Sequence, residues 1–441
     1  FQRFNLDFSQ EGAVEGGQLG EKLGVRGSNQ GPRANGFPIF SPSDYQGIGM
    51  TRSLPIIRRE NTFNPVASFT NILSRHTMKY GADIRRRQLT IFQTNRGNGR
   101  FNFNAQFTSD PNRTANTGDA LASFLLGTAS TIEQDFLLAF VGMRGTEYGS
   151  YIQDHWRVTD KLVLNIGLRY EYDTPYSEVA DRWTNFDVTT GKLLIAGFNT
   201  DKWAGVKPDR NNWATRRVST AANCPARWSG NFYNAQGSEA VNMRMHRQVP
   251  FGPINAIQID QFNNQPRPII DGLPPIPVLD FAIVSANPTG NLLAIDPNFK
   301  NGYAIQFNFQ VQQELPWNMV AKVGYVGNLN RQLDNSYNIN QPDPGPGTPA
   351  SRRPLRFVAS NVADVTYALS DGNANYHSLQ ATAEKRFSAG LSFLTAYTWS
   401  HSIDNIGNAF GGGANGPLPQ DIRYRFLDRG RGRNILRGPG R

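Results

Sequence analysis

Histidine, serine, aspartate and cysteine are the side chains that most often carry out nucleophilic or metal-dependent chemistry. The sequence holds five widely scattered histidines: His76, His155, His246, His377 and His401. None of them forms an i, i+4 pair or an HExxH motif, the spacing that places two imidazoles on one face of a helix to hold zinc. Structural roles in strands and hairpins are therefore favoured, and we predict no metal site and no cofactor.

Ser150, Asp154 and His155 bring the three residue types of a hydrolytic triad close together in the sequence. A working triad needs the three side chains on one side, with the aspartate orienting the histidine towards the serine. Successive residues of a strand point to opposite faces, so Asp154 and His155 cannot serve one site if this segment is a strand. We therefore predict no catalytic residue and no enzymatic activity, and no ligand-binding residue is assigned.

Cys224 is the single cysteine of the chain and lies in a stretch rich in proline and asparagine. A lone cysteine excludes an internal disulfide framework and a cysteine-based zinc site. It could act as a nucleophile, but no histidine stands with it in a recognisable motif. An incidental loop thiol is the favoured interpretation.

The formal charge of +10 raises the question of a nucleic-acid partner, because seven arginines lie between Arg423 and Arg441 in a Gly/Arg-rich tail. Such a tail could bind RNA or acidic lipid. The favoured interpretation is an unstructured end, and we predict no nucleic-acid partner. The glycines of residues 411–416 lack the Lys-Ser/Thr pair of a phosphate-binding loop, so they are interpreted as a flexible loop.

The composition is unusual for a soluble enzyme of 441 residues, because glycine (43), proline (27) and aromatics (11%) are plentiful while charged residues make up only 18%. Strands with one apolar face and one uncharged polar face, joined by long loops, have this composition. The sequence has no run of about 18 apolar residues, which argues against a transmembrane helix but leaves a membrane-spanning barrel open. Phe1–Phe4 shows no signal peptide.

The elements that must carry any function show a strict period of two. Between Lys161 and Asp173, one face carries Leu162, Leu164, Ile166, Leu168, Tyr170 and Tyr172. The other face carries Val163, Asn165, Gly167, Arg169 and Glu171. A helix would scatter the apolar residues around its circumference, so this segment is predicted to be a strand.

The same alternation recurs in residues 78–85, 101–107, 303–312, 378–387 and 391–399. These runs exceed the usual globular strand of about 5 to 6 residues. They match the roughly 9 to 11 tilted residues that cross a hydrocarbon layer. We expect membrane-crossing strands.

Short turns alternate with long connections. The turns lie at Ser74-Arg75, Thr159-Asp160, Pro316-Trp317-Asn318 and Ser388-Ala389-Gly390. Outer-membrane barrels combine short periplasmic turns with long extracellular loops in this way. Residues 174–300 show little periodicity and are expected to form one long loop, and a short helix is predicted over Thr117–Leu126 with Gly127 as its stop.

Aromatic residues near the strand ends favour interfacial girdles over ordinary packing beside turns. The members are Trp156, Tyr170, Tyr172, Trp317, Phe387, Tyr397 and Trp399. The polar faces suit the wet interior of a wide barrel, but a soluble sandwich exposes a similar face, so that alternative stays open.

Three groups of motifs resemble the barrel of TonB-dependent receptors, specifically the Oar-like group common in Acidobacteria. They are Arg58–Phe63 with Arg75–Gly81, Tyr151–Val158 with Leu164–Glu171, and Tyr376–Gln380 with Gly390–Phe393 and Tyr397–Asp404.

The resemblance implies an all-β fold: a transmembrane antiparallel outer-membrane β-barrel, present only in part. Full members carry a signal peptide, a carboxypeptidase-regulatory-like domain, a plug domain and a barrel of about 22 strands. The first three are not visible, so we expect an internal fragment or a truncated gene. We expect residues 1–63 to lead into the barrel, 64–405 to form it, and 406–441 to be a Gly/Arg-rich loop or disordered tail.

The resemblance also implies a function: ligand binding and gated uptake across the cell outer membrane of a Gram-negative-type bacterium. The expected partners are outer-membrane lipid, the energy-coupling TonB complex and an unknown extracellular ligand, for which siderophore, cobalamin, glycan and peptide all stay open. Two alternatives remain: a surface barrel for adhesion or secretion, and a soluble all-β binding module.

Overall fold

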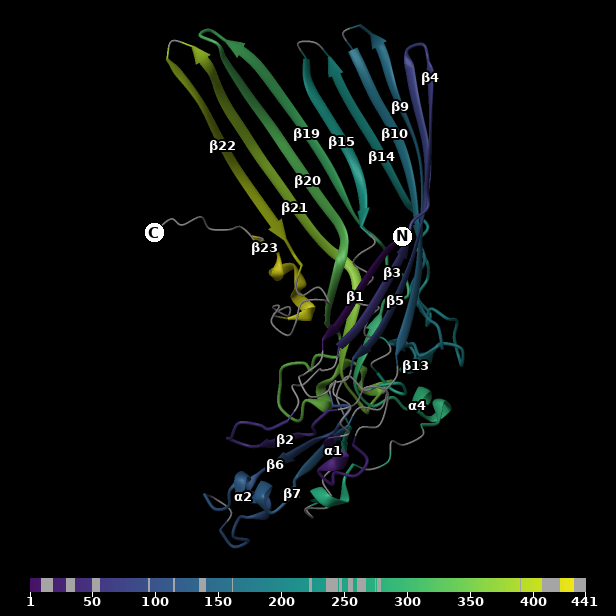
Figure 1. The fold of residues 1–441 in the computed structure, drawn as a ribbon, viewed down its shortest axis with the longest axis vertical. Helices are drawn as coiled ribbons and strands as arrows, with labels where there is room; N and C mark the ends of the chain where they lie inside the picture. The colour runs from purple at the N-terminus through teal and green to yellow at the C-terminus, as the bar shows by residue number, and fades with distance from the viewer. Residues whose placement is uncertain are drawn as a thin grey trace.

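In the computed structural model, long antiparallel strands form one curved, open sheet, and the connections at one end of it fold into a separate mass (Figure 1). The structure describes residues 1–8, 19–28, 36–49, 56–93, 96–113, 116–134, 140–160, 162–221, 224–234, 245, 248–252, 257–259, 267–273, 275, 279–388, 390–406 and 421–431.

The sheet runs in the order β1-β3-β5-β9-β10-β14-β15-β19-β20-β21-β22-β23, with β4 paired to β5, β11 to β9 and β18 to β21. Its strands are β1 (Gln2–Phe8), β3 (Ile56–Phe63), β4 (Val66–Leu73), β5 (His76–Gln93), β9 (Val141–Thr159), β10 (Leu162–Asp173), β11 (Ser177–Glu178), β14 (Asn212–Ala221), β15 (Cys224–Asn234), β18 (Gly290–Ile295), β19 (Gly302–Leu315), β20 (Met319–Asn338), β21 (Val362–Ser388), β22 (Leu391–Asp404) and β23 (Gly430–Arg431).

The remaining elements lie in the connections. They are α1 (Leu19–Lys22), β2 (Ile39–Pro42), β6 (Arg100–Phe103), η1 (Ala105–Phe107), α2 (Ala120–Leu125), β7 (Thr128–Ala129), β8 (Thr131–Gln134), β12 (Thr184–Asp187), β13 (Lys192–Ile195), β16 (Ile257–Ile259), β17 (Arg267–Pro268), η3 (Ile269–Asp271), α4 (Phe281–Ala286), η4 (Ala350–Arg352), η5 (Pro354–Phe357) and η6 (Ile422–Asp428). Among the residues placed, no helix is long and apolar enough to cross a membrane.

The predicted short turns join the strands at one end of the sheet, the upper end in Figure 1. Leu73 pairs with His76 across the first turn, and Leu315 pairs with Met319 across the third. Left-handed backbone makes these reversals tight: φ is 51° at Ser74 and 63° at Trp317. Hairpins of this kind fix the register, so the predicted alternation along each strand becomes two chemically distinct faces.

The structure places a hairpin inside residues 174–300, where we expected one long loop. Strand β14 pairs with β10, and β15 pairs with β19, so the two strands continue the sheet between the predicted hairpins. The alternation did not predict this hairpin, because Asn212–Ala221 has few apolar residues on alternate positions. Cys224 begins β15 beside the turn, so its backbone belongs to a strand.

Residues 101–107 are not a membrane-length strand, which corrects the prediction. Strand β6 ends at Phe103, and a 3-10 helix follows it. Phe101 and Phe103 lie in a hydrophobic cluster with Phe40 and Ile132, within the separate four-stranded sheet β16-β8-β6-β2. The predicted helix is present as α2; it begins later than expected because Asp119 caps it, and Gly127 follows it with φ 72°.

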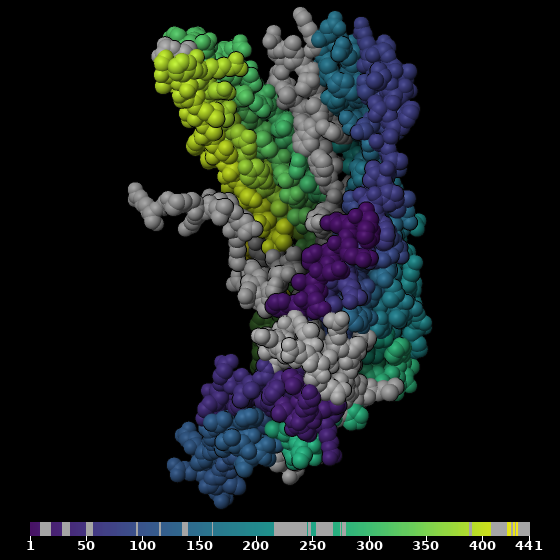
Figure 2. Space-filling view, in the orientation of Figure 1, coloured from purple at the N-terminus to yellow at the C-terminus, as the bar shows by residue number. Residues whose placement is uncertain are grey.

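The two ends of the chain also contribute to the sheet. Strands β1 and β3, within the expected lead-in segment 1–63, pair with each other and β3 pairs with β5. In the expected tail, Gly430 and Arg431 pair with the end of β22. The glycines of 411–416 lie outside the described residues. In the space-filling view, β22 and the β4–β5 hairpin lie on opposite sides of the turn end of the sheet (Figure 2).

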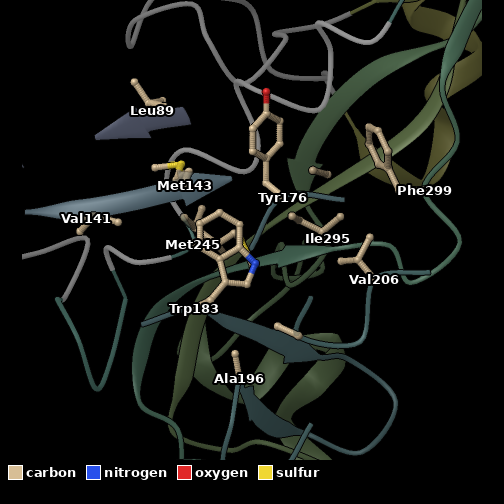
Figure 3. Packing of buried hydrophobic residues seen from close by; sticks show 13 residues of the cluster. Leu89, Val141, Met143, Tyr176, Trp183, Ala196, Val206, Met245, Ile295 and Phe299 are labelled. Atoms are coloured by element: carbon tan, nitrogen blue, oxygen red, sulfur yellow. The ribbon is translucent and has the colours of Figure 1, made fainter. Parts of the chain in front are cut away.

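The connections at the long-loop end pack back onto one face of the sheet. Trp183, Tyr176 and Met245 from the loops share a buried cluster with Leu89 and Met143 of the sheet (Figure 3). Leu89 and Met143 are cross-strand partners of β5 and β9. We call the face they share the inner face, and the opposite face the outer face. We call the packed connections, residues 174–206 and 290–299, the loop cover.

Alternation assigns every strand residue to one of the two faces. The inner face of β5, β9 and β10 carries charged residues on the turn side of Leu89 and Met143. The outer face exposes apolar side chains, at Ile84, Tyr148, Ile152, Ile166, Leu168, Phe309, Val311, Val323, Leu379 and Tyr397. The exposure of so many large apolar side chains on one face is the reverse of the pattern of a water-soluble sheet.

Candidate functional site: the inner face and its loop cover

Two ion pairs tie the inner faces of β5 and β9 together where they approach the loop cover. Arg85 Nη1 lies 2.8 Å from Glu147 Oε2, and Arg87 Nε lies 2.7 Å from Glu147 Oε1. One carboxylate thus forms ion pairs with two guanidinium groups. Glu147 is only 16% exposed, so these contacts are partly shielded from water.

The third strand joins through Arg169 of β10. Its Nη2 lies 3.0 Å from Asp83 Oδ1 on β5, and its Nε lies 2.5 Å from Glu171 Oε1. Nearer the loop cover, Asn301 Nδ2 donates to Asp173 Oδ2 at 2.9 Å. We call these groups on β5, β9 and β10 the charge ladder. It gives the inner wall fixed charges of both signs that can orient a polar solute.

The segments of the loop cover are fixed to one another by hydrogen bonds from buried amide side chains. Asn185 donates from Nδ2 to Ala204 O and Ile295 O, and Ile295 N donates back to Asn185 Oδ1 at 2.8 Å. Gln248 makes the same reciprocal contact with Leu293. Buried amides that satisfy backbone groups on two segments fix those segments against each other.

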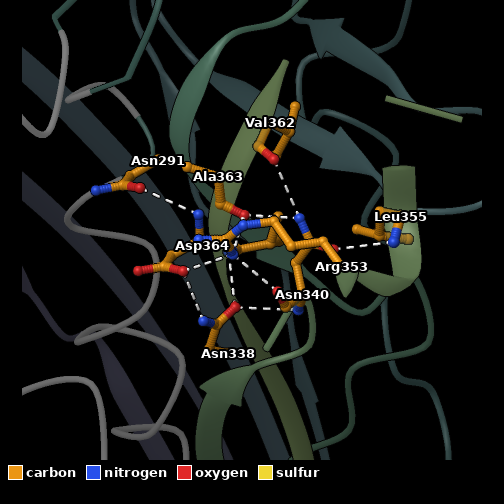
Figure 4. A network of polar contacts seen from close by, with 9 residues as sticks. Asn291, Asn338, Asn340, Arg353, Leu355, Val362, Ala363 and Asp364 are labelled. Carbon is orange, nitrogen blue, oxygen red and sulfur yellow. Dashed lines mark hydrogen bonds and ion pairs between the residues drawn. The ribbon is translucent and has the colours of Figure 1, made fainter. Parts of the chain in front are cut away.

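A second network holds the connection between β20 and β21 (Figure 4). Arg353 Nη1 donates to Asn340 O at 2.8 Å, Ala363 O at 2.8 Å and Asp364 Oδ1 at 2.7 Å. Asn340 also donates from Nδ2 to Ala363 O at 2.6 Å. This loop therefore lies against the end of the sheet next to the loop cover.

Glu178 fastens the loop cover to β9. Its carboxylate accepts from Gly142 N at 2.9 Å, Ala180 N at 2.7 Å, Arg182 N at 3.0 Å and Arg182 Nη2 at 2.9 Å. Burial alone would raise the pKa of Glu178, but the hydrogen bonds, led by that of the Arg182 side chain, outweigh it and lower the pKa. We call this arrangement the Glu178 clamp.

The Glu178 clamp predicts acid-induced opening of the loop cover. Because the folded-state pKa is lower than the unfolded-state pKa, the clamp stabilises the fold fully above the ordinary pKa of about 4.3. That stabilisation is lost as the pH falls through the folded-state pKa. Hydrogen exchange of residues 174–183 is expected to accelerate below pH 4 in the parent protein, and Glu178→Gln is expected to exchange faster at pH 7 with a flatter pH profile.

Glu314→Gln is the matched control, because Glu314 is exposed at the turn end of β19. It is expected to leave the exchange of residues 174–183 unchanged. Identical pH profiles for the parent protein and Glu178→Gln would show that another group controls the opening.

The structure separates the residues that sequence reasoning considered for chemistry. Asp154 Oδ2 accepts from His76 Nδ1 at 2.6 Å on the outer face, whereas His155 contacts Asn165 at 2.6 Å on the inner face. The predicted incompatibility of Asp154 and His155 is thus confirmed by the register. The partner of Asp154, His76, comes from β5, seventy-eight positions away, and only the β5–β9 pairing reveals it.

The other histidines lie apart from these. His377 contacts Tyr325 Oη at 2.6 Å on the outer face and stands opposite His401 in the register of β21 and β22. His246 lies outside the described residues. Within the ranges that the structure describes, no three His, Cys, Asp or Glu side chains gather in a way that could hold a metal ion.

Comparison with protein families decides the class of the chain. The model of the outer membrane beta barrel domain matches residues 1–437. The chain belongs to this family. It is an all-β outer-membrane barrel protein located in the outer membrane, and its open sheet is a partial barrel.

Solved structures of outer-membrane transporters are similar to the barrel chain at low identity. The transporter YddB from Escherichia coli has 12% identity and a TM-score of 0.48 over 85% of this chain. The copper transporter OprC has 11% identity and a TM-score of 0.39 over 79%, and the FrpB iron transporter from Neisseria meningitidis has 12% and 0.35 over 79%. The matches cover 38%, 42% and 37% of those chains, so this barrel chain spans about two fifths of their length. No curated protein matches.

Outer-membrane location gives each face of the barrel chain its solvent. The outer face contacts lipid, and the inner face lines the lumen. Two aromatic rows bound the apolar band: His76 stacks on Trp156 at 5.3 Å near the turns, and Tyr148 stacks on Tyr172 at 6.0 Å nearer the loops. Interfacial girdles have this arrangement, with the ring body in lipid and the polar atom in the headgroup layer.

Proposed function

We propose that this barrel chain forms part of a receptor that binds a solute outside the cell and passes it inward through a gated lumen. The observation that carries the proposal is the loop cover, which packs through Trp183 and Tyr176 onto the inner face. A general pore would leave the mouth open. A folded cover restricts entry to a solute that binds it.

The charge ladder supports the same proposal. Fixed guanidinium and carboxylate groups directly beneath the cover offer alternating partners to a polar solute that leaves the binding loops. We propose no bond-making or bond-breaking step, because binding and gated passage need only these contacts.

Energy coupling by a TonB-type inner-membrane complex is part of the proposal, and so is membership of the Oar-like group. Both of these proposals rest on the motifs of three hairpins, including Tyr151–Val158 followed by Leu164–Glu171. The structure supports that motif assignment to the extent that these residues form adjacent paired strands, β9 and β10.

Energised uptake tests the proposal. Cells with and without the gene would be supplied with four radiolabelled probes: a ferric siderophore, cobalamin, an oligosaccharide and an oligopeptide. We expect one probe to accumulate only in cells that carry the gene, and to stop accumulating when an ionophore collapses the proton gradient. Equal accumulation of all four probes with and without the gene, together with loss of cell adhesion on deletion, would replace transport by a surface-adhesion function.

A further inference from the structure

The outer face carries a group of arginines just beyond the Tyr148–Tyr172 row, on the side of the long loops. Along β5 the outer-face residue after Ile84 is Arg86, and it stands opposite Thr146 of β9. One step further along β9 on the same face is Arg144, opposite Gln88. Arg86 and Arg144 are therefore diagonal neighbours, with Cα atoms roughly 7 to 8 Å apart for this relation.

The group continues onto the neighbouring strands. Arg59 of β3 is paired with Thr90 of β5, and Arg3 of β1 is paired with Asn61 of β3. Alternation places both arginines on the same face as Arg86 and Arg144. We call these four residues the arginine row. Arg3, Arg59 and Arg86 are exposed, and Arg144 is half-buried.

Neutral acceptors hold three of these guanidinium groups. Arg86 Nη1 donates to Thr146 Oγ1 at 2.7 Å, and Arg3 Nε donates to Asn61 Oδ1 at 2.9 Å. Arg144 Nη1 donates to Met143 O at 2.9 Å. These contacts orient the side chains without cancelling their positive charge, in contrast to the inner-face arginines, which are paired with carboxylates.

The charge of this part of the outer face is strongly one-sided. From the Tyr148 row to the loop end, the outer-face positions on the described stretches of β1, β3, β5 and β9 carry the four arginines and one acid, Asp7, at the far end of β1. The carboxylate of Glu178 on β11 acts on Arg144. The four arginines still leave an excess of positive charge on the loop side of the aromatic girdle, at the depth of lipid headgroups. Guanidinium groups bind phosphate with two parallel hydrogen bonds, so phosphate is the complementary group at this depth.

We propose that the arginine row binds the phosphate groups of a lipid in the outer leaflet, with Arg86 and Arg144 as the central pair. The acyl chains of that lipid would lie along the apolar outer face on the turn side of the row, past Ile84 and Tyr148. The inference rests on the outer-membrane location and is independent of the proposed transport.

The test measures lipid binding to the detergent-solubilised protein by native mass spectrometry, with lipid A that carries two phosphates as the probe and dephosphorylated lipid A as the comparison. Arg86→Gln combined with Arg144→Gln is expected to weaken the binding of phosphorylated lipid A at least tenfold. Arg86→Lys with Arg144→Lys is expected to weaken this binding only a few-fold, because lysine keeps the charge but lacks the bidentate geometry.

Lys79→Gln is the matched control, because Lys79 is an exposed cation on the inner face of the same strand. It is expected to bind lipid A within twofold of the parent protein. Arg59→Gln, at an exposed position, gives a separate reading if the double variant does not fold, and it is expected to weaken binding several-fold.

Equal binding of phosphorylated and dephosphorylated lipid A would overturn the proposal. So would parent-level binding by Arg59→Gln and by the folded double variant. Displacement of lipid A by equimolar inorganic phosphate would also overturn it, because the row would then be a site for a free anion and not for a lipid.

Discussion

Trp183→Ala is expected to unfold the loop cover while the membrane strands stay paired. The indole is 1% exposed and lies in the cluster that joins the cover to Met143 of the inner face. Removing a buried tryptophan side chain costs about 3 to 5 kcal/mol, through lost transfer free energy and the cavity left behind. A second buried cluster, which includes Phe186, Leu193 and Leu292, lies within the cover, but the Trp183 cluster is the one that contains Leu89 and Met143 of the inner face, so the loss falls on the contact between cover and sheet.

Hydrogen exchange and limited proteolysis measure this prediction locally. Residues 174–206 of Trp183→Ala are expected to exchange and to be cleaved much faster than in the parent protein, whereas the β19–β22 strands keep their protection. Phe198→Ala is the matched control, because Phe198 is an aromatic of the same connection that is 51% exposed. It is expected to cost only about 1 kcal/mol. Unchanged protection of 174–206 in Trp183→Ala would contradict the assignment of this cluster as the joint.

Ile152→Arg is expected to abolish stable insertion of β9 into the membrane. Ile152 lies on the outer face of β9, opposite Tyr80 and Leu168, midway between the two aromatic rows. An arginine on the lipid face near the bilayer midplane costs about 2 to 4 kcal/mol. The level of heat-modifiable, folded protein in the outer-membrane fraction measures the effect.

Gln153→Arg is the matched control for Ile152→Arg, because it adds the same charge one residue further along on the inner face. Its expected cost is a few tenths of a kcal/mol, from the like charge of Lys79 directly opposite. If both variants fold to the same level, the two faces of β9 have the same solvent. The division into a lipid face and a lumen face would then be wrong.

Alternation in the sequence predicted most of the sheet. Strand β10 matches the predicted Lys161–Asp173 segment within a residue, because six alternating apolar side chains admit no other regular structure. The same criterion misassigned residues 101–107. Alternating phenylalanines look alike whether they face lipid or fill a small core, and here Phe101 and Phe103 fill a core.

The sequence indicated a polar face on the strands but assigned no residue to the candidate site. The polar face of β10, with Arg169 and Glu171, is visible in the sequence, but the partner of Arg169 on β5 is Asp83, eighty-six positions away. That contact depends on β5 pairing with β9 across a long connection, and no local pattern encodes such a register. Trp183 and Glu178 lie in a stretch without periodicity, so their role in joining the loop cover to the sheet follows only from the structure.

The most direct test of the central claim, that the outer face of this sheet contacts lipid and the inner face lines an aqueous lumen, is a nitroxide scan along β19 in bilayers. Single cysteines at residues 305–311, in a Cys224→Ser background, would be spin-labelled and their collision rates with oxygen and with a nickel chelate compared. We expect a period of two: labels at Phe307, Phe309 and Val311 collide with oxygen, and labels at Asn308 and Gln310 collide with the nickel chelate. Free access of the nickel chelate to both sets of positions would contradict the barrel and leave a water-exposed sheet.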